Sequence, residues 1–260
     1  MVRLDNLHSS HKAFVRRVLG EVREAFPDII TFGELFETEP RIEDMVLDYG
    51  LNFLLATPWE HKFVPQLRSY TRYLHSKHDR LRYLFPTTSH DSGSLAEEFG
   101  DVRSTTPRLM LSTLFGPGPS GVVQGVEEGI SKKIRFIGRQ GFVDKFGEHN
   151  FSDIIKKLNA LIQEYDCFQI SGNLQFIDHD HHAILGACRF DETTKKPRFL
   201  LFANMDILGT QYLKVDLASY GLDLNGRTLT DVLDHFEMKI AGPLLDVELP
   251  PCGVKAFKIS

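Results

Sequence analysis

The segment Ile29-Ile-Thr-Phe-Gly-Glu34 is a short apolar, β-branched run that ends in a glycine and a carboxylate. Such a run is typical of a buried strand. Apolar residues at helical spacing precede it over residues 11–26, and a second helical pattern follows it over residues 40–48. The alternation of strand and helix predicts βα units, whose strands pair in parallel.

The same alternation continues through the first 166 residues. Short apolar runs predict four further strands, and helical patterns cover much of the sequence between them. We count five such units, with the further strands at residues 1–5, 51–56, 84–88 and 121–124, and with helices within 59–81, 105–114 and 151–165. This rhythm predicts an α/β domain over residues 1–166.

The pattern changes after about residue 168, where the apolar runs shorten and turn residues separate them. This change predicts a second, all-β domain over residues 167–260, an antiparallel sandwich. Its expected strands are residues 174–177, 183–190, 199–204, 212–217, 244–249 and 254–259.

The composition is that of a globular protein, with 260 residues, 42% hydrophobic, 25% charged and a net charge of −5. No block of like charges indicates binding to a nucleic acid or to a membrane. The three cysteines are widely spaced and odd in number, which favours free thiols in a reducing compartment. No secretory signal or membrane-spanning run is visible, and the expected location is the cytoplasm.

Three predicted strands end in a carboxylate, namely Asp5, Glu34 and Asp91. In a closed (β/α) barrel the loops after the strands gather on one face and form the active site. Cleavage of a glycosidic bond with retention needs a nucleophilic carboxylate and a carboxylic acid, roughly 5–5.5 Å apart. A third carboxylate can stabilise the positive charge that develops on the sugar.

Two neighbouring residues support this interpretation. Arg3 lies two positions before Asp5, so both side chains share one face of the strand and the guanidinium keeps Asp5 ionised. Glu34 is expected to be a partly desolvated acid that can give up a proton. His90 precedes Asp91 and could donate a hydrogen bond to a sugar hydroxyl.

Arg3-Leu-Asp-Asn-Leu-His-Ser9, Phe32-Gly-Glu-Leu-Phe36 and Ser89-His-Asp-Ser-Gly93 resemble three short motifs of the α-amylase superfamily, glycoside hydrolase family thirteen. In that family the motifs follow barrel strands four, five and seven. The resemblance implies that Asp5 is the nucleophile, Glu34 the general acid/base and Asp91 the stabiliser. It also implies that Arg3 orients the nucleophile, and that His90 and His8 contact the sugar.

The resemblance extends to residues 121–127, which are similar to the strand-eight segment, and to residues 249–257, which are similar to the last strand of the C-terminal β domain. It implies a partial (β/α)8 TIM barrel, units four to eight, followed by the β sandwich. Strands one to three, with their D-x-x-x-x-N-H motif, are absent from the sequence. We therefore expect a fragment whose first strand is an exposed edge, and which alone is inactive and prone to aggregate.

The implied function is that of a retaining glycoside hydrolase or transglycosylase acting on α-glucans or malto-oligosaccharides. No organic cofactor and no metal site is expected, although the family allows a calcium ion. Two alternatives stay open: a non-catalytic glucan-binding or regulatory protein, and a half-enzyme that needs a separate N-terminal chain.

For two groups of residues, a role without function competes with a functional one. The three carboxylates could each be a surface acid at a strand end. The segment Asp178-His-Asp-His-His182 could bind a metal, but alternation divides its side chains between two faces, and a solvated turn is favoured.

Overall fold

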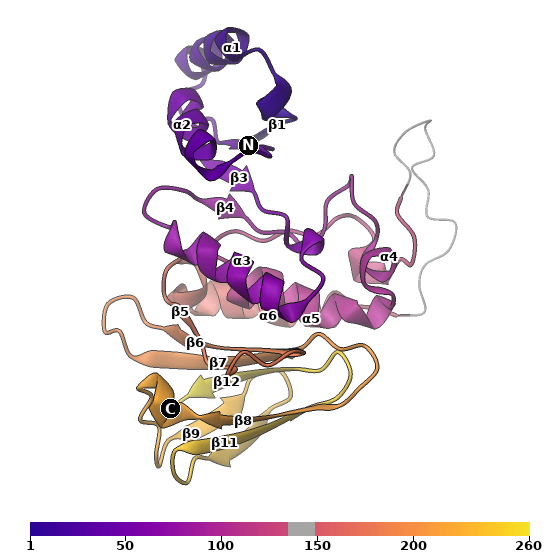
Figure 1. Cartoon of the computed structure of the whole chain (residues 1–260), viewed down its shortest axis with the longest axis vertical. Helices are drawn as coiled ribbons and strands as arrows, with labels where there is room; N and C mark the ends of the chain where they lie inside the picture. The colour runs from indigo at the N-terminus through magenta and orange to yellow at the C-terminus, as the bar shows by residue number, and fades with distance from the viewer. Residues whose placement is uncertain (135–148) are drawn as a thin grey trace.

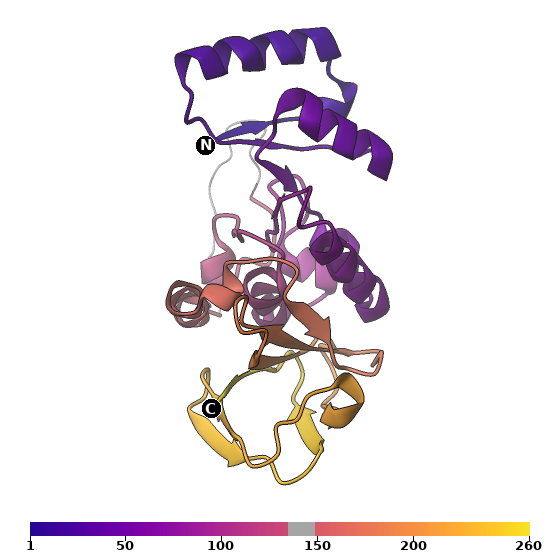
Figure 2. The same ribbon diagram turned by 90° about the vertical axis from the view of Figure 1, so that its left-hand side faces the viewer.

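The computed structural model describes residues 1–134 and 149–260 of the chain. Figures 1 and 2 show three layers along the long axis. The N-terminal strands and helices lie at one end, a group of helices lies in the middle, and the C-terminal β-strands lie at the other end. Among the described residues, no helix is long and apolar enough to cross a membrane.

The N-terminal layer is a parallel sheet of four strands in the order β1-β2-β3-β4. Its strands are β1 (Val2–Leu4), β2 (Thr31–Gly33), β3 (Phe53–Leu55) and β4 (Tyr83–Leu84). The crossover helices α1 (Lys12–Ala25) and α2 (Glu39–Tyr49) follow the first two strands. The predicted α/β alternation is therefore confirmed for this part of the chain.

The fifth predicted strand, residues 121–124, is not a strand in the structure, and the sheet is open. The chain does run beside β4, where Phe85 N donates to Pro119 O (2.7 Å) and Thr87 N to Gly121 O (3.2 Å). The segment Gly116-Pro-Gly-Pro-Ser-Gly121 leads into it, and its two prolines lack the N–H that a strand ladder requires. The strand order is thus that of an open sheet and not of a closed barrel.

The middle layer carries the helices that cover the C-terminal sheet. They are α3 (Val64–Ser76), α4 (Leu95–Phe99), α5 (Thr105–Met110), the π-helical continuation of α5 (Leu111–Phe115) and α6 (Ser152–Glu164). Short 3-10 turns occupy Leu7–Ser9, Pro58–Glu60, Val102–Ser104, Val126–Glu128, Asp166–Phe168 and Leu217–Tyr220.

The C-terminal strands form two antiparallel sheets, as the sequence predicts. One has six strands in the order β10-β9-β12-β7-β6-β5 and the other pairs β11 with β8. The strands are β5 (Leu174–Phe176), β6 (Ile184–Phe190), β7 (Pro197–Asn204), β8 (Gln211–Asp216), β9 (Thr228–Asp231), β10 (Phe236–Lys239), β11 (Leu244–Leu249) and β12 (Val254–Ile259). Sequence analysis missed β9 and β10, whose four-residue runs carry too few apolar residues to stand out.

Buried residues from both regions of the chain meet in one hydrophobic core. This cluster joins Leu19 of α1 and Met110 of α5 to Phe199 and Leu201 of β7 and to Ala256 of β12. A second cluster fills the space between the two antiparallel sheets, with members such as Phe202 on β7, Val215 on β8 and Val247 on β11. The six-stranded sheet is therefore covered on both faces.

Arg189 of β6 is wholly buried and ties the β region to the helices. Its guanidinium donates to the carbonyls of Leu114 (2.8 Å), Gly116 (2.6 Å) and Ile170 (3.1 Å), and to Asn173 Oδ1. Burial lowers the pKa of Arg189 to about 10, which still leaves it charged at neutral pH.

The segment at residues 178–182 is a turn, but Asp178 is only 1% exposed, so the prediction of a solvated turn is wrong for this residue. Its carboxylate lies 3.0 Å from Arg68 Nε on α3 and accepts a hydrogen bond from Gly186 N. Burial raises the pKa of Asp178, and the contacts with Gly186 and Arg68 oppose that rise. Alternation along the chain could not indicate a partner that lies 110 residues away.

Candidate active site

The first two strands bring Asp5 and Glu34 to the same end of the sheet. Leu4 is paired with Gly33, and Glu34 N donates to Leu4 O (2.9 Å). A Cβ atom at Gly33 would lie 2.7 Å from Leu7 Cδ1 and 2.8 Å from Leu51 Cδ1, so the glycine lets these two leucine side chains pack against the end of β2 without a shift. The carboxylates that follow the two strands are thereby set side by side.

Arg3 joins all three predicted catalytic carboxylates. Its Nη2 lies 2.9 Å from Asp5 Oδ1, 2.9 Å from Glu34 Oε1 and 3.5 Å from Asp91 Oδ2. Its Nη1 lies 3.1 Å from His90 Nε2. Sequence alternation predicted only the Arg3–Asp5 pair, because the contacts with Glu34 and Asp91 depend on the register of β2 and on the loop after β4.

The Asp5 and Glu34 carboxylates differ in their surroundings. The Asp5 side chain is 71% exposed, whereas that of Glu34 is 12% exposed. Glu34 Oε2 also accepts a hydrogen bond from the Asn6 N–H (3.0 Å), which Asn6 can present because it adopts a left-handed conformation at φ 50°. Because Asp5 Oδ1 and Glu34 Oε1 each lie 2.9 Å from Arg3 Nη2, these two oxygens can be no farther apart than twice that distance.

His90 Nε2 lies 3.1 Å from Arg3 Nη1 and 3.1 Å from Asp91 Oδ2. The guanidinium has only donors, so a hydrogen bond with Arg3 requires Nε2 to accept and the imidazole to be neutral. Donation from Nε2 to Asp91 requires a hydrogen on the same nitrogen. The two contacts therefore exclude one another as hydrogen bonds, and the presence or absence of a hydrogen on Nε2 selects between them.

The loop that carries Asp91 is held by groups that sequence analysis did not single out. Lys133 Nζ donates to Asp91 O (2.7 Å). Glu97 Oε2 accepts from the backbone N–H groups of Ser94 and Lys133, each at 2.8 Å. Burial would raise the pKa of Glu97, but these amide hydrogen bonds outweigh it and the pKa is lowered. The Ser94-x-x-Glu97 capping box was readable in the sequence, whereas its contact with Lys133 was not.

His8 lies in the loop after β1, and its contacts are with Phe36 in the loop after β2. Its Nδ1 accepts from Phe36 N (3.4 Å), and the two rings lie 5.6 Å apart. Of the six predicted site residues, the structure joins Arg3, Asp5, Glu34, His90 and Asp91 through direct contacts. His8 stands next to this group, on neighbouring loops.

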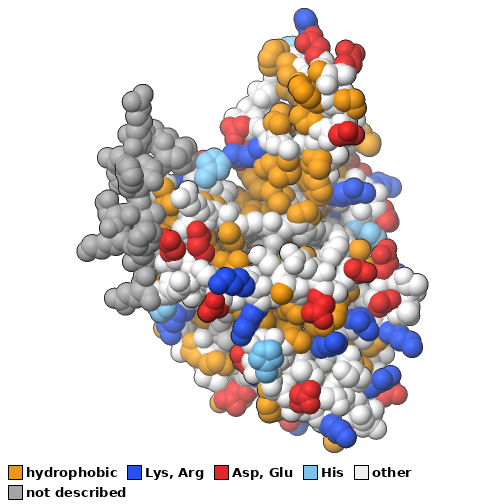
Figure 3. All heavy atoms as spheres, turned by 180° about the vertical axis from the view of Figure 1, so that it is seen from behind, with side chains coloured by type: hydrophobic (Ala, Val, Ile, Leu, Met, Phe, Trp, Pro, Cys, Tyr) orange, Lys and Arg blue, Asp and Glu red, His pale blue; other side chains and the backbone are white. Residues whose placement is uncertain are grey.

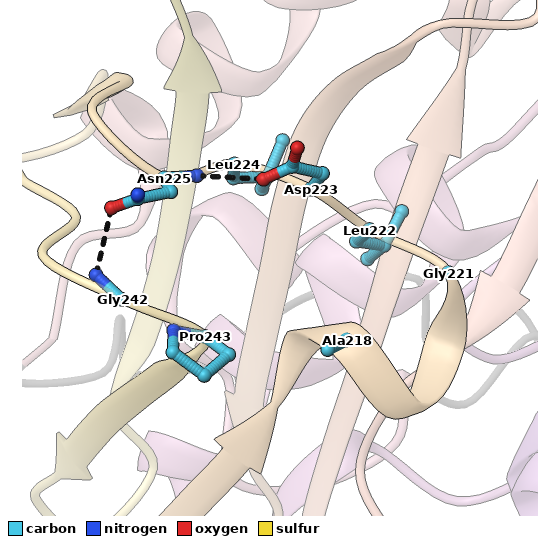
Figure 4. A pocket seen from close by; sticks show the side chains of 8 residues that line it. All are labelled: Ala218, Gly221, Leu222, Asp223, Leu224, Asn225, Gly242 and Pro243. Atoms are coloured by element: carbon cyan, nitrogen blue, oxygen red, sulfur yellow. Dashed lines mark hydrogen bonds between the residues drawn. The ribbon is translucent and has the colours of Figure 1, made fainter.

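A hollow of about 170 Å³ adjoins the Asp91 loop and has mostly apolar walls. Its lining includes Ser89, His90, Ser92, Val123 and Ile130. A larger hollow, of about 430 Å³, lies in the β region between the turns at residues 218–225 and 242–243. Figure 4 shows that Asn225 and Asp223 in this second hollow are engaged in backbone hydrogen bonds of the turns themselves. The first hollow is lined by His90 and by residues on either side of Asp91, whereas the second is lined only by residues of the β region.

No protein-family model matches the chain, and no curated protein matches it. Solved structures match it closely in backbone. An α-amylase from Anoxybacillus matches 99% of this chain with a TM-score of 0.75 at 16% sequence identity. An α-amylase from Geobacillus thermoleovorans, in complex with acarbose, gives the same three values. AmyP in complex with maltose matches 98% of the chain with a TM-score of 0.73 at 11% identity.

This chain has an α-amylase fold. The likeness covers residues on both sides of residue 166, so the α-amylase fold includes the parallel sheet, the middle helices and the antiparallel β region. The chain spans 58% of the length of the Anoxybacillus α-amylase, 59% of that from Geobacillus and 63% of AmyP.

Within residues 1–134 and 149–260, no group of three or more histidine, cysteine or acidic side chains is arranged to hold a metal ion. Asp5, Glu34 and Asp91 surround a guanidinium instead.

Proposed function

We propose that this chain carries the reacting carboxylates of a retaining glycoside hydrolase or transglycosylase that acts on α-glucans. On this proposal the four-stranded parallel sheet corresponds to strands four to seven of a (β/α)8 barrel. Asp5 is the nucleophile, Glu34 the general acid/base and Asp91 the stabiliser of the transition state. Arg3 orients the carboxylates, and His90 and His8 contact the sugar.

The observation that carries the proposal is the contact of one Arg3 nitrogen with both Asp5 and Glu34. It limits the separation of their oxygens to a range compatible with the roughly 5–5.5 Å of retaining enzymes, and leaves too little room for the water that inverting enzymes place between their carboxyl groups. The α-amylase fold and the maltose complex of AmyP support an α-glucan as the substrate.

The proposed chemistry is a double displacement. An Asp5 carboxylate oxygen attacks the anomeric carbon while the bond to the leaving oxygen breaks and Glu34 gives its proton to that oxygen. Glu34 then removes a proton from water, or from the hydroxyl of a second glucan, whose oxygen attacks the anomeric carbon and releases Asp5. The two side chains differ in their access to solvent, since Asp5 is 71% exposed and Glu34 is 12% exposed.

The test uses α-maltosyl fluoride, whose fluoride leaves without a proton from a general acid. It therefore requires only the first displacement, while turnover of a long glucan also requires the surrounding subsites. Although this chain alone is not expected to turn over glucans, we expect it to release fluoride and, in Glu34→Gln, to accumulate a maltosyl ester on the peptide containing Asp5. Mass spectrometry of the proteolysed protein locates the adduct.

Asp5→Asn is the matched control, because it keeps the size of the side chain and removes the nucleophile. Fluoride release and the adduct should both disappear in this variant. Release that persists in Asp5→Asn, or that does not exceed the rate in buffer for the unaltered chain, would contradict the proposal.

A further inference from the structure

A hollow of about 180 Å³ lies between α2 and the starts of β3 and β4. Val46 on α2 and Leu54 on β3 belong to its apolar wall, and its polar lining consists of Asn52, Arg80 and Arg82. We call it the basic hollow. In the part of the chain that the structure describes, no carboxylate lines it, so its charged groups are hydrogen-bond donors only.

The basic hollow lies at the end of the parallel sheet opposite the candidate active site. Asn52 immediately precedes β3 and Arg82 immediately precedes β4, and Leu54 N donates to Arg82 O (2.8 Å). Because the two strands run parallel, the residues before them lie at the same edge of the sheet. Asp5 and Glu34 follow their strands instead, so the hollow is a separate place on the molecule.

The side chain of Asn52 is held in one orientation. Its Oδ1 accepts from the backbone N–H of Thr31 (2.8 Å) and from the hydroxyl of Thr31 (3.2 Å). A backbone N–H requires an acceptor, so the oxygen of the amide must face Thr31, and the two N–H groups of Nδ2 remain for another partner. Nδ2 donates to no residue that the structure describes. Asn52 therefore supplies an oriented donor to the hollow that it lines.

The positive charge beside the hollow is only partly neutralised. Glu43 on α2 contacts Arg80 Nη1 (3.1 Å) and Lys77 Nζ (3.4 Å), so one carboxylate is shared by two cations. The exposed Arg82 guanidinium forms no ion pair and no hydrogen bond with any other described residue. The loop between α3 and β4, which carries the arginines, lies at the left of Figure 1 and at the right of Figure 3, where Lys and Arg side chains lie together on the surface.

We propose that the basic hollow binds a phosphate group, carried either by inorganic phosphate or by the monoester of a small sugar. A phosphate presents at least three acceptor oxygens, which match the donors of Asn52, Arg80 and Arg82, whereas a carboxylate presents two. The planar guanidinium of arginine can donate two parallel hydrogen bonds to a phosphate. The hollow is smaller than the roughly 300–1,000 Å³ of pockets for larger ligands, which favours a small anion.

The experiment titrates the whole chain with inorganic phosphate in a calorimeter, at an ionic strength held constant with sodium chloride. We expect saturable binding of one phosphate per chain, and a shift of the Asn52 side-chain amide signals in NMR spectra. Asn52→Asp keeps an acceptor for Thr31 but replaces the Nδ2 donor by a carboxylate oxygen, so binding should weaken at least about tenfold. Arg82→Gln should weaken binding by a similar factor. Arg227→Gln is the matched control, because Arg227 is an exposed arginine of the β region, and it should bind phosphate as the unaltered chain does.

Glucose 1-phosphate distinguishes the two sources of the phosphate group, since tighter binding than inorganic phosphate indicates a sugar monoester and equal or weaker binding indicates the free ion. No saturable binding, unchanged affinity in Asn52→Asp and Arg82→Gln, or an equal loss in Arg227→Gln would each overturn the inference. The inference goes beyond the proposed function and does not depend on it. Asp5→Asn abolishes the proposed chemistry but leaves the hollow intact, so phosphate should bind that variant unchanged, and failures of the two proposals are distinguishable.

Discussion

Arg3 Nη2 lies 2.9 Å from Glu34 Oε1, and the same nitrogen also contacts Asp5 and Asp91. Lysine has a single nitrogen on a flexible stem and cannot hold this set in a fixed geometry. We therefore expect Arg3→Lys to lower the rate of fluoride release from α-maltosyl fluoride by about 100-fold. Arg80→Lys makes the same change at an exposed pair with Glu43 and should leave the rate unchanged. Equal rates in the two variants would exclude a positioning role for Arg3.

Glu97→Ala removes the acceptor that joins Ser94 to Lys133 and should loosen the loop of Asp91. We expect a loss of about 1 kcal/mol in the free energy of unfolding and faster hydrogen exchange at both amides. Glu164→Ala, at the exposed end of α6, should change neither quantity. Because the pKa of Glu97 is lowered in the folded protein, this stabilisation should persist at neutral pH and be lost as the pH falls below the usual range for glutamate.

The free energy of unfolding should also depend on pH through His75, which is buried as a neutral ring. Burial, aided by Arg189, lowers its pKa to about 3. The neutral ring donates from Nε2 to Phe115 O and accepts from Gly172 N at Nδ1. The unfolded chain binds the proton more readily, so the free energy of unfolding should fall as the pH drops from 6.5 toward 3.

This group contributes a slope of up to about 1.4 kcal/mol per pH unit over that interval. Denaturant unfolding at a series of pH values measures the slope. His75→Gln should remove this contribution, and His11→Gln, at an exposed helix start, should preserve it. An unchanged slope in His75→Gln would show that other groups govern the acid transition.

Arg189 uses three nitrogens to satisfy three carbonyl groups and one side-chain amide. A lysine at this position would leave several buried acceptors without a partner, at about 1–3 kcal/mol each. We expect Arg189→Lys to cost at least about 3 kcal/mol in urea unfolding. Arg198→Lys on neighbouring β7 is exposed and should change the unfolding free energy by less than about 0.5 kcal/mol. Similar values for the two variants would refute the proposed structural role.

Periodicity and turn residues predicted α1, α2, α3, α5 and α6, the first four parallel strands and six of the antiparallel strands, but not the five-residue helix α4. The prediction of a fifth parallel strand was wrong, because prolines and glycines lead into a segment that follows the edge of β4 without a regular ladder. Strands β9 and β10 were not predicted, because strands of four residues give a pattern too short to distinguish from loops.

The sequence motifs predicted the site residues, whereas the contacts among these residues depend on the register of the strands. The sequence placed Asp5, Glu34 and Asp91 at strand ends but gave no distance between them. The shared contact with Arg3 depends on the pairing of Leu4 with Gly33, and the hold on the Asp91 loop depends on Lys133, 42 residues further along the chain. Such long-range partners carry no local sequence signal.

The core that joins Leu19 and Met110 to Phe199 and Ala256 has a consequence for how such a protein can change over generations. The change in sequence pattern near residue 166 does not coincide with a gap in that core. A recombination event at that point would expose the apolar faces of β7 and β12. It would also remove the carbonyl groups of Leu114 and Gly116, which accept hydrogen bonds from Arg189. The two regions are therefore expected to be inherited as one unit, and a gene fusion that replaced the β region alone would have to rebuild the buried face as well.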